Sequence, residues 1–261
     1  MQFNMFFKSS LDETLSDLQT KIRADPGDAK LRIFLFQLLC VLGQWNRALE
    51  QLQICAQLDS SSATMAQTYR EVIRCEIYRE KVFSGHYRPQ FLGQPDEWIG
   101  TLLASLDQVT LGHYDQADQL REQAFESAPE IAGTIDDVDF EWLADMDSRI
   151  GPLCEVILNG LYYWVPFSKI HAIRMEPPKD LRDIVWMPIA LTLINDSEVL
   201  GFIPARYAKS YTAPEDAIKL SRSTVWQELS ETTCLGKGQK MWVTDRDEYA
   251  LLNIRKVIFQ T

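Results

Sequence analysis

The stretch LGQWNRALEQLQICAQLDSSS, residues 42–62, has the spacing expected of a helical hairpin. Gly43 precedes Trp45 by two residues, Ala48 follows three residues later, and a polar run closes the stretch. A glycine before a bulky aromatic residue is typical of the turn between antiparallel helices, because glycine accepts a left-handed backbone angle. Ala48 and Cys55 lie on one face, two turns apart, and are small enough for two helices to approach closely. The stretch is therefore predicted to be the second half of a helical hairpin.

The same spacing recurs on both sides of this stretch. Downstream, LGHYDQADQLREQAFESAPE places Gly112 and Tyr114 at the glycine and aromatic positions. Upstream, DETLSDLQTKIRADPGD closes at Pro26, and Ser60 follows Pro26 by 34 residues, the period of tetratricopeptide repeats. Three units at compatible spacing predict tetratricopeptide-like helical hairpins rather than one isolated helix pair.

The segments between and before these units are less regular. Residues 63–84 predict one long helix, and the prolines and glycines of SGHYRPQFLGQPDEW predict an irregular connection after it. Ser10 and Glu13 form a capping box that should begin the first helix. The apolar residues of the segment 1–7 are expected to fold onto the first hairpin, or alternatively to form an arm that docks a partner.

After Gly133 the sequence changes to short alternating segments. EVILNGLYYWVPF predicts two strands joined at Asn159-Gly160, the strongest hairpin signal in the chain. Further strands are predicted over residues 184–194, 198–203, 239–243 and 251–259, and one helix over APEDAIKLSRSTVWQEL, residues 213–229. The sequence thus predicts an α+β fold. Tetratricopeptide-like, all-α repeats over residues 1–133 precede a small antiparallel β-rich domain with one helix over residues 134–261.

Two sets of residues are candidates for binding. Stacked hairpins form a concave face on which apolar anchors can hold an amphipathic helix. The anchors predicted on the helices are Leu11, Leu15, Leu18, Trp45, Tyr69 and Tyr114. In the second half, polar and aromatic residues beside apolar runs form either structural ion pairs that hold loops to the sheet or a recognition surface. These residues are Asp147, Arg149, Arg182, Asp183, Trp186, Arg206 and Tyr207.

The composition limits the classes of partner. The net charge of -11, shared by both halves, argues against a nucleic-acid partner and against anionic membrane surfaces. The five cysteines form no C-x-x-C pair, which is typical of a reducing compartment. The sequence shows no leader peptide and no apolar run of the roughly 20 residues that a membrane helix needs. A cytoplasmic protein without membrane insertion is expected.

Motifs for catalysis are weak. The three histidines are far apart in sequence, and Cys154 with His171 would be a poor nucleophile and base pair without a recognisable setting. The acidic segment from Asp136 to Asp147 lacks the glycine and the closing glutamate of a calcium loop, so it is expected to be a solvated linker. The chain has no P-loop and no G-x-G-x-x-G. We therefore expect no enzyme activity, no metal and no cofactor.

Several longer segments together resemble the ImpE/SciE/TagJ family of type VI secretion accessory proteins. They are LRIFLFQLLCVLGQWNRALEQL, FEWLADMDSRIGPLCEVILNGLYYWVPFSKI, PPKDLRDIVWMP, PARY and GKGQKMW, which span nearly the whole chain. GKGQKMW departs from the family pattern at Lys237 and Lys240, where an apolar residue and an arginine would be expected. The resemblance implies a non-enzymatic, virulence-associated role at the contractile sheath, with the small sheath subunit and the sheath-recycling AAA+ ATPase as partners. It supplies no catalytic residues.

These inferences predict an adaptor that captures a helix of a sheath subunit in a groove over residues 10–131. A second, weaker prediction is that the segment 1–9 or the first helix docks on the ATPase. Two alternatives remain open at this stage. One is a scaffold that self-associates through its repeats, and the other is a regulator whose C-terminal domain senses a small molecule.

Overall fold

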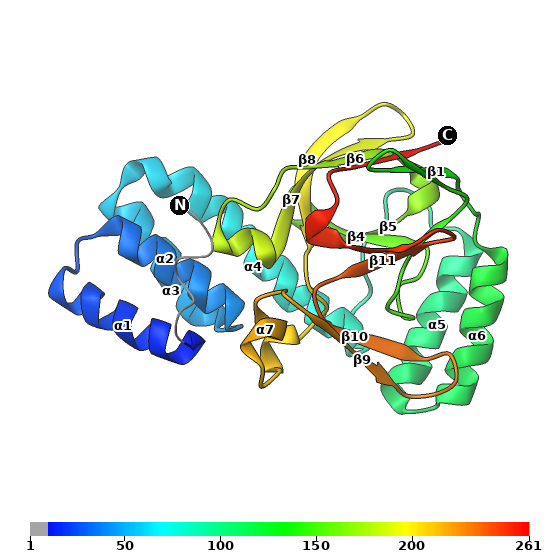
Figure 1. Ribbon diagram of the computed structural model, residues 1–261, viewed down its shortest axis with the longest axis horizontal. Helices are drawn as coiled ribbons and strands as arrows, with labels where there is room; N and C mark the ends of the chain where they lie inside the picture. The colour runs from blue at the N-terminus through cyan, green and yellow to red at the C-terminus, as the bar shows by residue number, and fades with distance from the viewer. Residues whose placement is uncertain (1–9, 261) are drawn as a thin grey trace.

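The computed structural model describes residues 10–260, in which helices precede strands (Figure 1). The helices are α1 (Leu11–Ala24), α2 (Ala29–Val41), α3 (Trp45–Leu58), α4 (Ala63–Phe83), α5 (Glu97–Leu111), α6 (Tyr114–Ser127) and the short α7 (Asp216–Lys219). The order of helices followed by an antiparallel β-rich region confirms the predicted fold class. The predictions made for residues 1–9 lie outside the described residues.

The two glycine–aromatic turns form as predicted. Gly43 between α2 and α3 has φ 67°, and Gly112 between α5 and α6 has φ 78°, both in the left-handed region. The capping box of α1 is present, because the Ser10 side chain accepts the Glu13 N–H while the Glu13 carboxylate accepts the Ser10 N–H. An irregular connection follows α4, as its prolines and glycines predict.

The helical hairpins do not stack into one array. The α1–α3 lobe, which we define as residues 11–58, lies at one end of the molecule, and the α5–α6 hairpin lies at the other (Figure 1). The 21-residue α4 runs between them and packs against the sheet at β5. The single groove expected over residues 10–131 is therefore not formed, because α4 and the connection after it carry the last hairpin to the far end of the sheet.

The strands are numbered along the chain. They are β1 (Gly133–Ile135), β2 (Val138–Phe140), β3 (Leu143–Asp145), β4 (Leu153–Leu158), β5 (Leu161–Pro166), β6 (Ile170–Met175), β7 (Trp186–Leu193), β8 (Glu198–Pro204), β9 (Thr224–Glu228), β10 (Cys234–Gly238), β11 (Met241–Thr244), β12 (Glu248–Ala250) and β13 (Lys256–Phe259). Within residues 10–260 an eight-stranded antiparallel sheet has the order β2-β1-β13-β6-β7-β8-β4-β5, and smaller sheets join β12-β11-β3 and β10-β9.

The secondary structure predicted after Gly133 is correct at the Asn159-Gly160 hairpin and wrong in three places. Asn159 and Gly160 have φ 50° and 74° and join β4 to β5 as predicted. The helix expected over residues 213–229 is mostly absent: α7 ends at Lys219, and β9 follows. The supposed acidic linker forms β1, β2 and β3, and the strand expected over residues 251–259 begins with a 3-10 turn.

The large sheet separates two apolar layers. On one face, Ile157 and Trp164 pack with the helices, and on the other, Val156 and Trp242 lie between the large sheet and the β12-β11-β3 sheet. Both faces of β4 are covered, so all six of its residues are buried. The helical half and the sheet thus share one core. No helix among residues 10–260 is long and apolar enough to span a bilayer.

Candidate functional site

The predicted protein-binding residues differ in exposure. Leu11, Leu18, Trp45 and Tyr69 are buried in the core, whereas Leu15 and Tyr114 are half-buried. Tyr114 begins α6, at the opposite end of the molecule from the α1–α3 lobe (Figure 1). The six side chains therefore do not form one surface. Five of them already pack within the chain, since Leu15 also lies against the buried cluster.

The helical face expected to hold a partner helix is covered by the chain's own residues. The 3-10 helix η4, Leu181–Ile184, lies against α2. The guanidinium of Arg182 lies 4.5 Å from the centre of the Tyr69 ring. The rings of Trp45 and Trp186 lie 5.8 Å apart. The C-terminal half thus covers the side of α2–α4 on which Trp45 and Tyr69 lie, and that side is not available to a partner helix.

Arg182 and Asp183 stabilise the loop that carries η4. The Asp183 carboxylate accepts the N–H of Lys179 at 2.8 Å and the N–H of Asp180 at 2.9 Å. Arg182 Nη2 donates to Asp180 Oδ2 at 2.5 Å. These contacts are local to the loop and support the structural reading of the LRDIVW motif.

Asp147 and Arg149 form a second ion pair, between β3 and β4. Arg149 Nη2 lies 2.5 Å from Asp147 Oδ2, and the same oxygen accepts the N–H of Gly236 at 3.0 Å. Asp147 is fully buried, and the Arg149 guanidinium lies 4.6 Å from the centre of the Phe83 ring of α4. The pair therefore connects β10 and α4 to the sheet.

Arg206 reaches from the end of β8 into the helical half. Its guanidinium donates to the carbonyl oxygens of Cys40 and Val41 at 2.8 Å each, and to that of Lys219 at 2.7 Å. Cys40 and Val41 are the last residues of α2, so the arginine binds carbonyls at the helix end, where that of Cys40 also accepts the N–H of Gly43 at 3.1 Å. Burial lowers the pKa of Arg206 to about 10, which leaves it charged at neutral pH.

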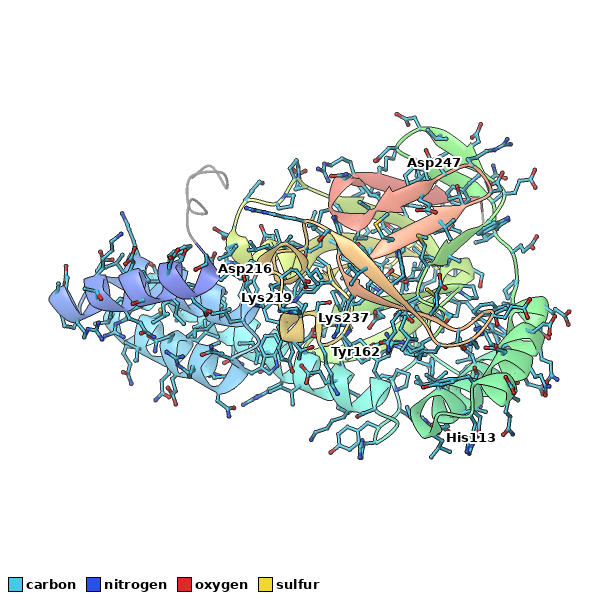
Figure 2. The ribbon with its side chains drawn as sticks, turned by 60° about the horizontal axis from the view of Figure 1, so that its bottom comes forward. His113, Tyr162, Asp216, Lys219, Lys237 and Asp247 are labelled. Carbon is cyan, nitrogen blue, oxygen red and sulfur yellow. The ribbon has the colours of Figure 1, made fainter. Side chains whose placement is uncertain are left out.

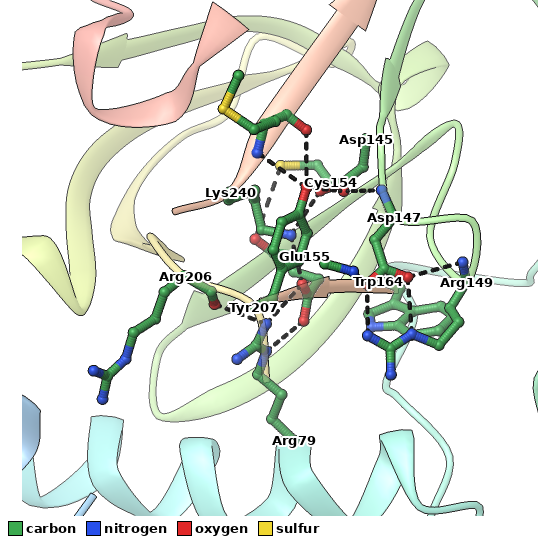
Figure 3. A network of polar contacts seen from close by, with 12 residues as sticks. Arg79, Asp145, Asp147, Arg149, Cys154, Glu155, Trp164, Arg206, Tyr207 and Lys240 are labelled. Carbon is green, nitrogen blue, oxygen red and sulfur yellow. Dashed lines mark hydrogen bonds and ion pairs between the residues drawn. The ribbon is translucent and has the colours of Figure 1, made fainter. Parts of the chain in front are cut away.

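A larger ionic network lies between α4 and the sheet (Figure 3). Glu155 of β4 is its centre: Arg79 Nε of α4 lies 2.5 Å from Glu155 Oε1, and Lys240 Nζ lies 2.7 Å from Glu155 Oε2. Lys240 Nζ also lies 2.6 Å from Asp145 Oδ2 of β3. On the helical side, Arg79 Nη1 lies 3.0 Å from Glu76 Oε1. All five side chains are buried.

The charges of the network balance. With the Asp147–Arg149 pair and Arg206 included, four acidic and four basic side chains meet in this region. Burial would raise the pKa of Glu155, but the charges of Arg79 and Lys240 outweigh it and hold that pKa well below its usual range. Burial raises the pKa of Asp145 to about 6 despite the opposing charge of Lys240. Both carboxyls are therefore mainly ionised at neutral pH.

The hydroxyl groups around this network complete its hydrogen bonding. Tyr162 donates to Glu155 Oε1 at 2.5 Å, and Tyr207 donates to Asp145 Oδ1 at 3.1 Å. The Tyr207 oxygen in turn accepts the N–H of Met241 at 3.0 Å. Because its members bond to one another, the network presents no group poised to attack a substrate. We interpret it as the element that joins the helices to the sheet.

The proposed thiol and imidazole pair does not assemble. Cys154 lies on β4 and His171 on β6, three strands apart in the sheet and so about 14 Å across it. Burial raises the pKa of the Cys154 thiol well above its usual range, so it stays protonated.

The acidic segment has partners within the fold. Asp136 accepts the N–H groups of Arg255 and Lys256, while Asp145 and Asp147 belong to the ion pairs above. Among the described residues, no three His, Cys, Asp or Glu side chains gather as a metal site would require. These carboxylates are therefore bonded within the β-rich half.

Sequence reasoning missed the centre of the network: Glu76, Arg79, Asp145, Glu155 and Lys240 were not among the candidate sites. One signal was available, because Glu155 interrupts the apolar run LCEVIL, and a charge at such a position needs a buried counter-ion. In the sequence, Lys240 differs from the arginine expected of the family, and nothing in the sequence marks it as an ion-pair partner. In the structure it is the cation that joins β3 to β4.

Comparisons with known proteins agree with this architecture. The family model described as "ImpE protein" matches residues 137–258. A Pseudomonas aeruginosa protein named "Type VI secretion system accessory component TagJ" is 46% identical over 250 residues, covering 96% of this chain and 88% of that protein. The chain belongs to the ImpE family. The expected family resemblance is thereby confirmed.

A solved relative shows the same fold over nearly the whole length. The crystal structure of protein VPA1032 from Vibrio parahaemolyticus superimposes with a TM-score of 0.86 at 26% identity, covering 96% of this chain and 94% of that one. The region matched by the ImpE model contains Asp145, Glu155, Arg206 and Lys240, whereas Arg79 lies before it. The ionic network thus joins the ImpE-matched region to the helices that precede it.

Proposed function

We propose that this chain is a non-enzymatic accessory protein of a type VI secretion system that acts by binding other proteins. The observation that carries the proposal is the 46% identity to the protein named TagJ, which extends over 96% of the chain. The buried, mutually paired ionic side chains add support, since they hold the fold together and offer no reactive group. We propose that the protein acts in the cytoplasm, where the contractile sheath of the secretion system is expected to lie.

Within this role we propose an adaptor for the small sheath subunit, for the sheath-recycling AAA+ ATPase, or for both. We choose the α1–α3 lobe as the docking element, because it projects from the sheet at one end of the molecule (Figure 1). Leu58, the last residue of α3, is 44% exposed. Ile33 of α2 is half-buried and belongs to neither of the apolar clusters that residues 10–260 form. Such side chains can anchor a helix from a partner.

A matched pair of variants tests this assignment in the full-length chain. Leu58→Asp changes the end of α3, and Leu111→Asp makes the same change at the end of α5, where Leu111 is 64% exposed. Both chains should keep the wild-type melting temperature. Each variant is titrated by calorimetry with the purified sheath subunit and, separately, with the ATPase. Leu58→Asp should bind at least one of these two proteins at least about tenfold more weakly than the wild type, as expected when an apolar anchor is replaced by a charge. Leu111→Asp should bind both with the wild-type affinity.

The outcomes separate the general proposal from its location. Equal loss for Leu58→Asp and Leu111→Asp would move the docking surface away from the α1–α3 lobe. Absence of binding by the wild-type chain to either protein would overturn the adaptor role itself.

A further inference from the structure

Within residues 10–260, strand β9 has a neighbouring strand along one side only. It pairs with β10 in an antiparallel register that sets Val225 opposite Lys237. At either end of the ladder the N–H of Leu229 donates to Thr233, and the N–H of Gln239 donates to Ser223. Because bonded and non-bonded pairs alternate in an antiparallel ladder, residues 223, 225, 227 and 229 are bonded to β10. The backbone groups of residues 224, 226 and 228 therefore point away from it.

No hydrogen bond reaches those outward backbone groups from any residue between 10 and 260. The edge of the large sheet at β5 differs, because Gln90 donates its N–H to Tyr162 and accepts that of Trp164. The other edge, β2, is only three residues long. β9 has five residues, and Figure 2 shows its hairpin crossing the front of the molecule with its turn at the α5–α6 end. Native proteins normally cover such an edge or use it.

The side chains beside this edge indicate what it accepts. Val225 is 46% exposed and offers an apolar contact. At the far end of β9, a pocket of about 560 Å³ lies between Leu229–Glu231 and the first turn of α6. The residues that line the pocket include Asp115 and Glu231. Glu228 directly precedes the first lining residue of this loop, Leu229, in the sequence. These three exposed carboxylates form no ion pair within the described part of the chain.

Arg121 of α6 is already paired and does not compensate Glu228 or Glu231. Arg121 is engaged by Asp118 at 2.5 Å and by the hydroxyls of Thr232 and Thr233. Asp115 also lies in the first turn of α6, where it offsets the partial positive charge of the helix end. The end of β9 is thus locally acidic, in a chain that already carries a net charge of -11.

We propose that β9 is a docking edge for an extended segment of a partner protein. The segment adds as a third strand to the β9–β10 sheet and carries a lysine or arginine that lies beside Glu228 and Glu231. Backbone hydrogen bonds to residues 224, 226 and 228 supply the affinity, and the acidic end selects the basic side chain. A second copy of this chain fits less well, because two chains of net charge -11 repel. This site is separate from the α1–α3 lobe and does not depend on that assignment.

The probe is a synthetic, end-blocked seven-residue peptide of alternating valine and threonine with a lysine at each end. Hydrogen exchange followed by NMR should show the amides of Thr224, Trp226 and Glu228 slowed at least about tenfold by the peptide. The amides of Val225 and Gln227, already bonded to β10, serve as internal controls. The same peptide with its interior amides N-methylated keeps its charge, but these amides cannot donate hydrogen bonds to β9. It should therefore bind at least about tenfold more weakly than the unmethylated peptide.

A variant tests the same edge from the protein side. Glu228→Pro removes an N–H that faces away from β10, so the ladder and the melting temperature should be kept while peptide binding is lost. Glu228→Gln separates the loss of charge from the loss of the edge, and should weaken binding only a few-fold. Equal binding of the two peptides would overturn the proposal, because attraction would then be purely ionic. A dimer of the free chain that Glu228→Pro dissociates would also overturn it, since a second copy would occupy the edge.

Discussion

Replacing Lys240 by methionine should reduce the free energy of unfolding by about 3–5 kcal/mol, the cost of leaving buried charges without their partner. Lys240 Nζ lies 2.6 Å from Asp145 Oδ2 and 2.7 Å from Glu155 Oε2, and the side chain is 1% exposed. Methionine is unbranched and apolar and can fill the space of the lysine side chain, so little of the lost stability should come from a cavity. The effect therefore measures the charge rather than the packing.

The two carboxylates should respond differently to this change. Glu155 keeps Arg79 as a partner, whereas among the described residues Asp145 keeps the Tyr207 hydroxyl and the N–H of Asp147 and no cation. The pKa of Asp145, already raised to about 6 by burial, should rise above neutrality once the lysine charge is gone, so the carboxyl takes up a proton. Each unit by which this pKa rises, up to the pH of the measurement, costs about 1.4 kcal/mol, so proton uptake by Asp145 accounts for part of the expected loss.

Urea unfolding of four chains measures the coupling directly: wild type, Lys240→Met, Asp145→Asn and the double variant. Removing one cation and one anion together restores the balance, so the double variant should be more stable than the sum of the single losses implies, by at least about 1 kcal/mol. Lys237→Met is the matched control, because Lys237 is half-exposed and forms no ion pair among the described residues. It should change stability by less than about 0.5 kcal/mol. If Lys240→Met behaved like Lys237→Met, the network would not stabilise the fold.

Three further predictions concern stability. Arg206→Met should cost about 3 kcal/mol in urea unfolding, because two buried carbonyls and one part-buried carbonyl lose a charged donor, whereas Arg246→Met at an exposed site should be nearly neutral. Gly43→Ala should lower the melting temperature, because the left-handed φ and the Tyr211 ring both oppose a Cβ, whereas Gly100→Ala in open space on α5 should raise it slightly. Ionisation of Asp145 should reduce stability by up to about 3 kcal/mol as the pH rises from 3.8 to about 6, since its folded pKa is raised; in Asp145→Asn, pH-dependent unfolding should lack this decline.

The parts of the fold that the sequence predicts well are those fixed by local backbone requirements. Gly43 and Gly112 adopt the left-handed angles that their turns need, and Asn159-Gly160 closes the β4–β5 hairpin. Each of these signals acts within a few residues, so no knowledge of the rest of the chain is needed. What the hairpins pack against is not local, and the predicted single groove was wrong for that reason.

The stretch 213–229 shows how a distant partner decides between helix and strand. Its apolar residues satisfy a helical spacing, yet residues 224–228 pair with β10. Ser221, at φ 54°, ends the helical turn that α7 begins. Both outcomes fit the local pattern, and only the hydrogen bonds to residues 234–238 select the strand.

The ionic network could not be predicted from one sequence because its partners are far apart along the chain. Arg79 precedes Glu155 by 76 residues, and Lys240 follows Asp145 by 95. The sequence offers 26 basic and 37 acidic residues, and nothing local indicates which of them pair. A charge inside an apolar run, as at Glu155, predicts that a partner exists but not its identity.

The network also restricts how a partner can bind. Arg79 of α4 and Arg206 of the sheet each reach into the opposite half, so moving the helices would leave both charges buried without acceptors. Opening the covered face of α2–α4 would in addition expose Trp186, which is fully buried and donates to Glu76 at 2.9 Å. Docking on surfaces that are already exposed avoids both costs. Binding at either proposed site, the α1–α3 lobe or the β9 edge, is therefore expected to leave the helices and the sheet in place.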